Sequence, residues 1–225
     1  MRMSVIIPAL NEEANIAATL ANARAQRPHE IIVIDGGSSD RTVAMAMPLA
    51  DQVLVGERSR AAQMNLGADQ ATGDALLFLH ADCLLQLGAI QEAARLLRKP
   101  RVAAACFQMR VPLANPLYRC IEASASIRAG LLGIIYGDQG LFVRREIFER
   151  AGEFPKLKLM EDVYLSLRLR KLGRIVVANK RIVVSPRRWQ KSGLIRQTLR
   201  NWALTALAAA GVHPDRLAAN YPIIR

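Results

Sequence analysis

The stretch ALLFLHADC, residues 75–83, is a short apolar run that ends in a carboxylate at Asp82. Gly73 and Asp74 precede the run and polar residues end it, a pattern that predicts a buried strand. Ligands of α/β sheets bind at the carboxyl ends of the strands, so Asp82 is expected at the mouth of a binding site. A carboxylate there suits a hard cation such as Mg²⁺ or Mn²⁺, which can hold phosphates. The alternative is a loop aspartate that caps a helix whose first turn begins near residues 84–87.

Strand and helix patterns alternate on both sides of this run. Before it, the sequence predicts strands at residues 4–8, 30–35 and 52–55, and helices at 12–25, from 41 onward and at 58–70. After it come predicted helices at 87–98, 116–132, 144–151, 160–172 and 194–210, and strands at 102–111, 141–143, 175–178 and 181–184. Strands that alternate with helices at this spacing pair in parallel through right-handed crossovers. The predicted fold class is therefore α/β, with a mostly parallel central sheet flanked by helices.

Polar residues follow three of these predicted strands, in the turn after Pro8, at Asp35 and at Asp82. Asn11 is the predicted N-cap of the first helix, with acidic residues in the turn that follows. Gly36 and Gly37 after Asp35 do not form a G-x-G-x-x-G fingerprint, and the chain has no P-loop lysine. A dinucleotide site of the Rossmann type and a P-loop NTPase are therefore disfavoured.

Composition narrows the class of protein further. At 225 residues the chain is long enough for a full core, as one domain or one domain with an appendage. Its three widely spaced cysteines give neither a disulfide framework nor a metal-ligand spacing, which indicates reduced thiols in a cytoplasmic protein. The N-terminus lacks the apolar region of a signal peptide, and no run reaches the roughly 18 apolar residues of a membrane span.

The net charge of +12 indicates an anionic partner, such as phosphates or anionic lipid. Aromatic residues make up only 5% of the chain and show no stacking pattern of single-stranded nucleic-acid binders. We therefore expect no nucleic-acid partner.

Five short motifs, in this order, resemble glycosyltransferase family 2, whose members have the GT-A fold. They are VIIPALNEE at residues 5–13, VIDGGSSD at 33–40, LHAD at 79–82, MED at 160–162 and RRW at 187–189. Each motif alone is weak, but the ordered set at strand ends and helix starts is specific. The sequences AQMN at residues 62–65 and GDQG at residues 137–140 resemble motif variants of a compact bacterial branch of the family. The resemblance implies a GT-A catalytic domain over residues 1–190, followed by a basic amphipathic helix and tail over 191–225.

The resemblance also implies which residues bind a nucleotide-sugar. The turn containing Pro8, Ala9, Asn11 and Glu12 matches the first nucleotide-binding turn, and Asp35 matches the carboxylate that contacts the base. Further implied contacts to the nucleotide-sugar are Asp40, Asp82, Gly140, Arg188 and Trp189. Arg60, which precedes a helix turn that faces the same edge, is a predicted phosphate contact. The R-R-W element resembles a family motif near the acceptor and the pyrophosphate. For Arg60, a solvated surface arginine is an equal alternative.

Metal binding and catalysis are implied in the same way. Asp82 matches the last acidic residue of the D-x-D motif, which binds metal and sugar-nucleotide, while His80 stands where that motif has its first Asp. Histidine can ligate a metal, although a structural histidine is the alternative. The implied cofactor is Mn²⁺ or Mg²⁺. Glu161 and Asp162 match the E-D pair, whose Asp is the general base of inverting members; helix capping is the alternative for both.

The resemblance thus implies an inverting, metal-dependent glycosyltransferase that moves a sugar from a nucleotide-diphosphate donor, expected to be a UDP-sugar, to an acceptor hydroxyl. A nucleotidyltransferase is one alternative, although its Gly-rich basic signature is absent from the acidic first turn. A non-catalytic module that binds a sugar-nucleotide or a membrane surface is another. The joint presence of Asp35, Asp82 and Asp162 argues against lost activity.

The C-terminal segment, residues 187–225, is rich in Arg and Lys and includes an Ala/Leu helix with Trp202. Arg196 and Arg200 flank the apolar residues of this helix, as in helices that lie reversibly on an anionic leaflet. Many acceptors in the family are lipid-linked, so peripheral contact with the inner face of the membrane is an expectation. The alternative is an amphipathic helix that packs its Leu and Trp face on the core.

Overall fold

The first half of the chain forms four parallel strands joined by helices. The computed structural model describes residues 1–209 and 212–218. The strands are β1 (Met3–Ala9), β2 (Glu30–Asp35), β3 (Gln52–Val55) and β4 (Ala75–Phe78). They lie in the order β3-β2-β1-β4, and their connections contain α1 (Ile16–Ala25), α2 (Thr42–Ala46) and α3 (Arg60–Gln70). The predicted alternation and parallel pairing of this half are confirmed.

The second half extends the same sheet with strands of both directions. They are β5 (Cys83–Leu85), β6 (Val102–Arg110), β7 (Phe142–Arg144) and β8 (Arg174–Val184), which complete the order β4-β7-β6-β8-β5. β7 is antiparallel to both β4 and β6, β6 and β8 are parallel, and β5 is antiparallel to β8. Four of the seven strand pairings among the described residues are therefore parallel, and the α/β class is confirmed.

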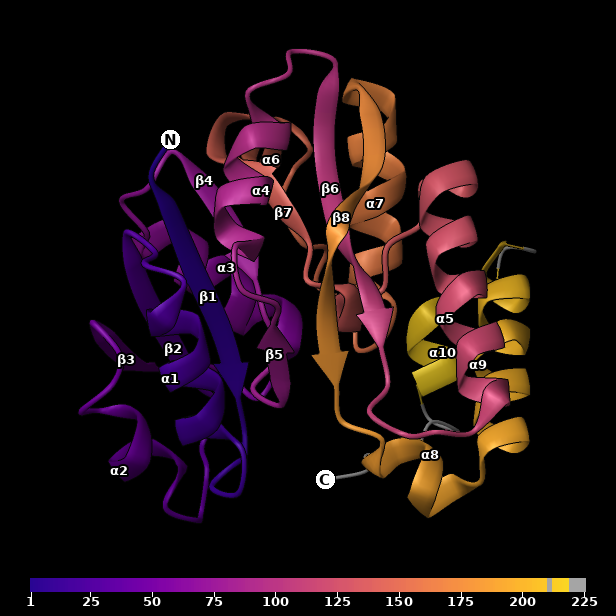
Figure 1. Ribbon diagram of the computed structural model, residues 1–225, viewed down its shortest axis with the longest axis horizontal. Helices are drawn as coiled ribbons and strands as arrows, with labels where there is room; N and C mark the ends of the chain where they lie inside the picture. Colours follow the sequence, from indigo (N-terminus) through magenta and orange to yellow (C-terminus); the bar gives the residue numbers. More distant parts are fainter. Residues whose placement is uncertain (210–211, 219–225) are drawn as a thin grey trace.

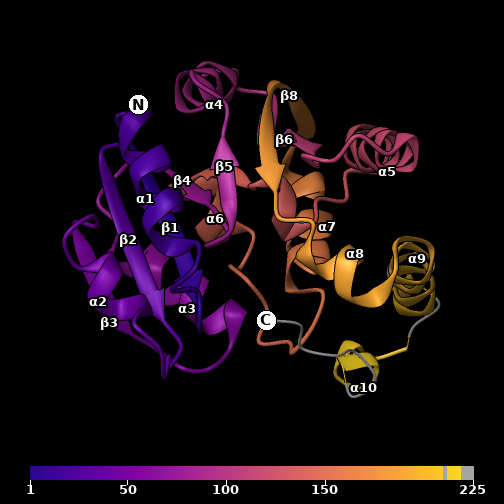
Figure 2. The same cartoon turned by 60° about the horizontal axis from the view of Figure 1, so that its bottom comes forward.

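The remaining helices lie beside and beyond this sheet (Figures 1 and 2). They are α4 (Ala89–Leu97), α5 (Pro116–Ile127), the π-helical turn η1 (Arg128–Leu132), the 3-10 turn η2 (Gly137–Gln139), α6 (Arg145–Arg150), α7 (Glu161–Leu172), α8 (Arg187–Ser192), α9 (Leu194–Ala209) and α10 (Pro214–Ala218). Among the helices of the described residues, none has both the length and the apolar character needed to cross a membrane. The expected domain boundary after residue 190 lies inside α8, and the division into two parts stays a prediction.

Two apolar clusters cover the two faces of the sheet. Successive side chains of a strand point to opposite faces, and in β1 Val5 and Ile7 join one cluster while Ile6 joins the other. The buried helical residues of the first cluster come from α1, α2, α4, α5 and α8, and those of the second come from α3, η1, α6 and α7. Because both faces of the sheet are buried, the sequences of its central strands are continuous runs of apolar residues.

The sequence-based boundaries of three elements were wrong, and two of these errors come from strand pairings that are distant in the sequence. The helix expected from residues 84–87 is preceded by β5, in which Cys83 and Leu85 are buried while Leu84 is exposed, the two-residue period of a strand. Asp82 therefore does not cap that helix. The strands predicted at 175–178 and 181–184 are one strand, β8, whose pairing with β6 shifts register between Cys106 and Gln108.

The first helix also begins later than predicted, at Ile16 rather than at residue 12. Asn11 adopts a left-handed φ of 54°, and its side-chain oxygen accepts a hydrogen bond from Ser39 N at 2.9 Å instead of capping α1. The last helix was predicted to reach Ala210, which, like the tail 219–225, lies outside the described residues.

The close contact between α3 and β1 depends on Gly67. An alanine Cβ there would lie 2.4 Å from Cγ2 of Ile6 in the buried strand, so helix and sheet would have to separate. We expect Gly67→Ala to lower the free energy of unfolding by about 1–3 kcal/mol, measured by urea denaturation. Gly130→Ala is the matched control, because its Cβ would meet only Val177 Cγ2, at 3.9 Å. Equal stabilities of the two variants would contradict the prediction.

Candidate functional site

The carboxyl ends of β1 and β2 are held by a network of polar turn residues. The buried carboxylate of Asp35 accepts hydrogen bonds from Gly37 N (2.9 Å), Ser38 N (2.9 Å) and Ser38 Oγ (2.5 Å). Ser38 Oγ in turn accepts from Asn11 N at 2.9 Å, which ties the two turns together. The network fixes the backbone that the sequence analysis assigned to nucleotide binding.

Asp40 joins the same network and connects it to Glu12. Its carboxylate accepts from the N and Oγ1 of Thr42, at 2.9 and 2.5 Å, and Thr42 Oγ1 accepts from Glu12 N at 2.8 Å. Although burial opposes the shift, the hydrogen bonds from Thr42 lower the pKa of Asp40. Asp40 therefore acts in this structure as a turn-forming residue next to the predicted site, and its contact with a nucleotide-sugar stays a prediction.

Behind the turns, buried Gln63 of α3 holds the ends of the two strands together. Its Nε2 donates to Ala9 O at 3.0 Å and to Ile34 O at 2.8 Å. Pro8 and Ala9 pair in register with Ile34 and Asp35 at this edge of the sheet. The site is thus built on the ends of rigid strands.

The centre of the site is a three-residue ion cluster that joins Glu12, Asp82 and Arg187. The Arg187 guanidinium donates to both carboxylate oxygens of Glu12, with Nη1–Oε2 at 2.9 Å, and its Nη2 lies 3.0 Å from Asp82 Oδ2. Burial raises the pKa of Asp82, although the Arg187 charge opposes that shift. Residues 175 positions apart in the sequence therefore meet at the ends of β1 and β4.

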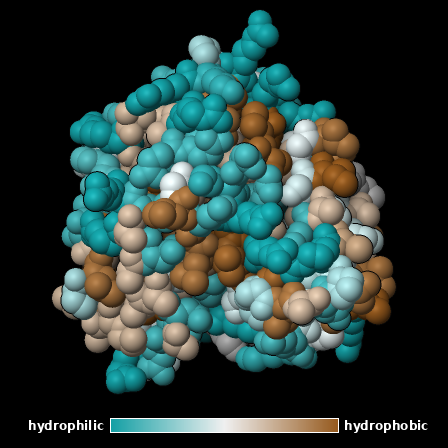
Figure 3. Space-filling model, viewed as in Figure 1, coloured by the Kyte–Doolittle hydropathy of each residue, from teal (hydrophilic) through white to brown (hydrophobic). Residues whose placement is uncertain are grey.

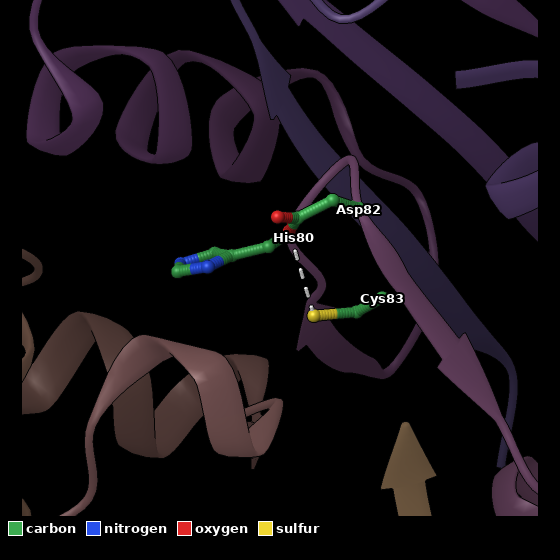
Figure 4. A group of neighbouring side chains, drawn as sticks. All are labelled: His80, Asp82 and Cys83. Carbon is green, nitrogen blue, oxygen red and sulfur yellow. Dashed lines mark hydrogen bonds between the residues drawn. The ribbon is translucent and has the colours of Figure 1, made fainter. Parts of the chain in front are cut away.

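The loop after β4 carries three side chains with metal-ligating atoms. One such atom each from His80, Asp82 and Cys83 lies within 4.8 Å of the others. Figure 4 shows the side chains of this loop, with Cys83 Sγ hydrogen-bonded to Asp82 Oδ1 at 3.8 Å. Burial raises the pKa of Cys83 well above its usual range, so the thiol keeps its proton and does not suit a hard cation.

His80 is the second candidate ligand. Burial, together with the charges of Arg60, Arg188 and Arg187, lowers its pKa to about 3, so its imidazole is neutral at pH 7. Its buried Nε2 has no hydrogen-bond partner among the described residues, and the metal-ligand role of His80 stays a prediction beside the structural one. Asp82 and His80 therefore fit a divalent cation, which would take its other ligands from the phosphates of a substrate and from water.

Space around His80 depends on Gly137 in η2. An added Cβ at Gly137 would lie 2.6 Å from His80 Nε2 and 3.5 Å from Asp162 Oδ2. Gly137 N also donates to Asp162 Oδ2 at 2.5 Å. Gly137 thus brings Asp162 beside His80 of the loop after β4.

Asp162 and Glu161 occupy the first turn of α7, which Met160 introduces with a left-handed φ of 65°. Besides Gly137, Asp162 accepts at Oδ1 from Val163 N at 2.7 Å, so each oxygen keeps a second lone pair for a substrate proton. Glu161 is buried with Oε1 3.3 Å from Arg60 Nη1. Burial raises the pKa of Glu161, although Arg60 opposes the shift.

Of the other predicted site residues, Arg188 lies near His80 and Asp138, whereas Gly140 and Trp189 pack against apolar side chains. Arg188 is close enough for its charge to act on the pKa of both His80 and Asp138. Gly140 lies apart from the cluster in the core, with a φ of 62°, and a Cβ added to it would lie only 3.1 Å from Cδ2 of Phe107. Trp189 is 8% exposed and packs edge-on against Tyr118, with ring centroids 6.0 Å apart.

Two residues of this region were not among the predicted contacts to the nucleotide-sugar or the metal. Arg187 was predicted only as the first residue of the R-R-W element, whose other two residues were assigned as contacts. Asp138 stands in the Gly137–Gly140 motif, and burial raises its pKa while Arg128 opposes the shift. For each residue, the only signal in the sequence was that it belongs to a family motif. The spacing of residues in the sequence does not reveal which side chain of a motif points into the site.

Comparison with known proteins agrees with this geometry. The family model described as glycosyl transferase family 2 matches residues 4–120, just over half of the chain. The O-antigen chain rhamnosyltransferase RfbN of Salmonella typhimurium is 26% identical over 195 residues, which cover 77% of this chain and 62% of that protein. A PGL/p-HBAD biosynthesis glycosyltransferase of Mycobacterium tuberculosis is 39% identical over 90 residues, 35% of this chain and 34% of that protein. The matched part thus spans less than two thirds of each of these relatives.

Solved structures share the fold. Staphylococcus aureus TarS 1-349 in complex with UDP-GlcNAc matches with a TM-score of 0.67 at 19% identity, over 82% of this chain and 58% of that chain. Glucosyl-3-phosphoglycerate synthase from Mycobacterium tuberculosis, in complex with Mn²⁺, UDP and glucosyl-3-phosphoglycerate, matches with a TM-score of 0.59 at 19% identity, over 78% and 69% of the two chains. The family match and the shared GT-A architecture together lead to one conclusion: the chain belongs to glycosyltransferase family 2.

Proposed function

We propose that this chain transfers a sugar from a UDP-sugar to an acceptor hydroxyl, with inversion at the anomeric carbon and with a divalent cation. The observation that carries the proposal is the meeting of Glu12, Asp82 and Arg187 at the strand ends, with Asp162 nearby on the Gly137 turn. Cationic groups beside an acidic metal-binding loop suit a diphosphate leaving group. The UDP, UDP-GlcNAc and Mn²⁺ named for the solved neighbours support this choice of donor and cofactor.

In the proposed reaction, the acceptor oxygen forms a bond to the anomeric carbon while the bond from that carbon to the diphosphate oxygen breaks. The electron pair of the broken bond leaves with UDP. The hydroxyl proton passes to the carboxylate of Asp162, which acts as the general base. Arg187 supplies positive charge near the leaving diphosphate. Attack from the side opposite the diphosphate inverts the anomeric configuration.

When bound, the cation neutralises negative charge on the diphosphate and thereby stabilises the leaving group. Asp82 is the proposed main ligand and His80 the second. The neutral state of His80 suits that role, because a protonated imidazole cannot ligate a metal. Mn²⁺ and Mg²⁺ are both accepted by oxygen-rich sites of this kind.

A panel of nucleotide-sugars with and without Mn²⁺ or Mg²⁺ tests the proposal. We expect release of UDP from at least one UDP-sugar, only with the cation present, and NMR of the product reports the anomeric outcome. Release of pyrophosphate from UTP plus a sugar phosphate would instead identify the nucleotidyltransferase alternative. Tight binding of UDP-sugar without turnover of any acceptor would identify the non-catalytic binding module.

We also propose that α9 lies on an anionic membrane surface, which would suit a lipid-linked acceptor. Ile195 and Leu199, spaced by four residues along one helix face and outside any described pocket lining, are 63% and 56% exposed. Leu194 and Leu204 pack against the core clusters, so the alternative of core packing holds for only part of this helix. Apolar residues also gather along the margin of the molecule where α5 and α9 lie (Figure 3). Arg196 and Arg200 of the same helix provide positive charge that is complementary to anionic lipid.

Co-sedimentation with vesicles tests the membrane proposal. We expect the chain to bind vesicles with anionic lipid, to bind less as salt rises, and to lose binding in the double variant Ile195→Glu, Leu199→Glu. Leu87→Glu is the matched control, because Leu87 is 74% exposed and lies just before α4. Equal binding of both variants would overturn the proposal, and a dimer of the wild-type chain that the double variant abolishes would assign the face to a second copy instead.

A further inference from the structure

A pocket outside the ion cluster adjoins the proposed general base. It lies between α5, η2, α8 and α9, and its lining includes Arg128, Tyr136, Asp138, Trp189, Asn201 and Trp202. Asp138 directly follows Gly137, whose N–H binds the Asp162 carboxylate. The lining residue Asp138 is thus adjacent in the chain to the group that binds the proposed general base, although Asp162 is not itself part of the lining.

Two buried polar atoms at this pocket lack partners. Neither Asp138 Oδ1 nor Trp189 Nε1 has a hydrogen-bond partner among the described residues. An unsatisfied buried polar atom costs about 1–3 kcal/mol, so native structures rarely keep one without a ligand or a water molecule to pair with it. Both residues line the same pocket, and the indole N–H is a donor only. A hydroxyl group both donates and accepts, so hydroxyl groups can pair with either kind of atom.

The side chains that form the wall of the pocket are held by contacts with one another and with α9. The Arg128 guanidinium lies over the Tyr136 ring, 3.4 Å from its centroid, and Nη2 donates to Gln139 Oε1 at 2.6 Å. Tyr136 is tied to α9 through a 2.5 Å hydrogen bond between its hydroxyl and Thr205 Oγ1. Side chains held in this way lose little further entropy when they bind a ligand.

The size and the rim of the pocket indicate what it binds. Its cavity of about 30 Å³ has room for roughly two water-sized groups, which suits a hydroxyl or hydroxymethyl group but not a whole ring. At the rim, Trp202 is 52% exposed and offers a flat apolar face against which a sugar ring can lie. The carboxyl group of Asp138 and the prior engagement of Arg128 make the pocket unsuited to a phosphate.

We propose that this pocket is the acceptor subsite and that the acceptor is itself a sugar, whose hydroxyl-bearing edge enters between Asp138 and Trp189 while its ring lies on Trp202. The inference rests on the proposed glycosyl transfer and names the class of its acceptor. Asp138 is then a specificity-determining residue, because it pairs with a substrate hydroxyl, and Asp162 takes the proton of the hydroxyl that reacts.

The test uses the full chain, the UDP-sugar that the donor panel identifies, and soluble acceptors: a set of methyl and aryl glycosides and, for comparison, glycerol phosphate. We expect transfer to at least one glycoside and none to glycerol phosphate. Trp202→Ala and Asp138→Asn should each raise the KM for that glycoside about tenfold or more, with a smaller change in kcat. Leu207→Ala, on the same helix and 45% exposed but outside the pocket lining, should leave this KM unchanged.

The outcomes separate this inference from the proposed function. If the wild-type chain neither transfers nor hydrolyses any UDP-sugar, the proposed function fails and the inference fails with it. If the chain transfers sugar only to glycerol phosphate, or if both pocket variants keep the wild-type KM for the glycoside, glycosyl transfer stands and the acceptor subsite is overturned. Thermal unfolding of each variant confirms that a rise in KM occurs in a folded protein.

Discussion

Asp82→Ala is expected to abolish the gain in UDP affinity that Mn²⁺ provides. Loss of residues that merely orient metal ligands typically costs 10–100-fold in metal affinity, so loss of a direct ligand should cost at least about 100-fold. The fold should survive, because Arg187 keeps its paired contacts with both oxygens of Glu12 when Asp82 is removed. Isothermal titration of UDP with and without Mn²⁺ measures the effect.

Asp74→Ala is the matched control for this experiment. Asp74 is also an aspartate at a strand boundary, but it is exposed and pairs with Arg2 at 3.2 Å, away from the ion cluster. It should keep the wild-type affinity for UDP and Mn²⁺. A folded Asp82→Ala protein with the same Mn²⁺-dependent affinity as Asp74→Ala would remove Asp82 from the metal site.

The first half of the fold could be predicted because its signals are local. Each of the strands β1, β2 and β4 is a buried apolar run with polar residues at its carboxyl end, and parallel pairing follows from the helices between the strands. The second half depends on distant pairing. β5 contains only Cys83, Leu84 and Leu85, and it exists because β8 pairs with it from about a hundred residues away. No window of sequence around such a short strand contains that information.

The site shows the same division between local and distant information. Asp82 and the E-D pair could be placed from motifs, because each lies at the end of a strand or the start of a helix. The role of Arg187 could not, because adjacent residues of a helix point in different directions and only the tertiary structure turns Arg187 toward Glu12 and Asp82. Likewise, the missing partner of Asp138 Oδ1 becomes apparent only when α5, α8 and α9 surround it.

Asp162→Asn is expected to lower kcat about 10²-fold or more while leaving UDP affinity within a few-fold of wild type. Asparagine has nearly the same shape, and its side-chain oxygen can still accept from Val163 N or Gly137 N, so the turn beside His80 should largely persist. What the variant loses is the ability to take the acceptor proton. Initial rates of UDP release with saturating donor and acceptor, together with UDP titration, separate these two effects.

Glu146→Gln provides the matched control for the base, because Glu146 also occupies the first turn of a helix, α6, but its side chain is 71% exposed and pairs with Arg144. The kcat of the Glu146→Gln variant should equal that of the wild-type chain. The Asp162→Asn variant could also fail by loosening the Gly137 turn, in which case UDP affinity and thermal stability would fall together with kcat. A selective loss of kcat supports Asp162 as the base, whereas near-normal turnover in a folded Asp162→Asn protein would transfer that role to Glu161 or Asp138.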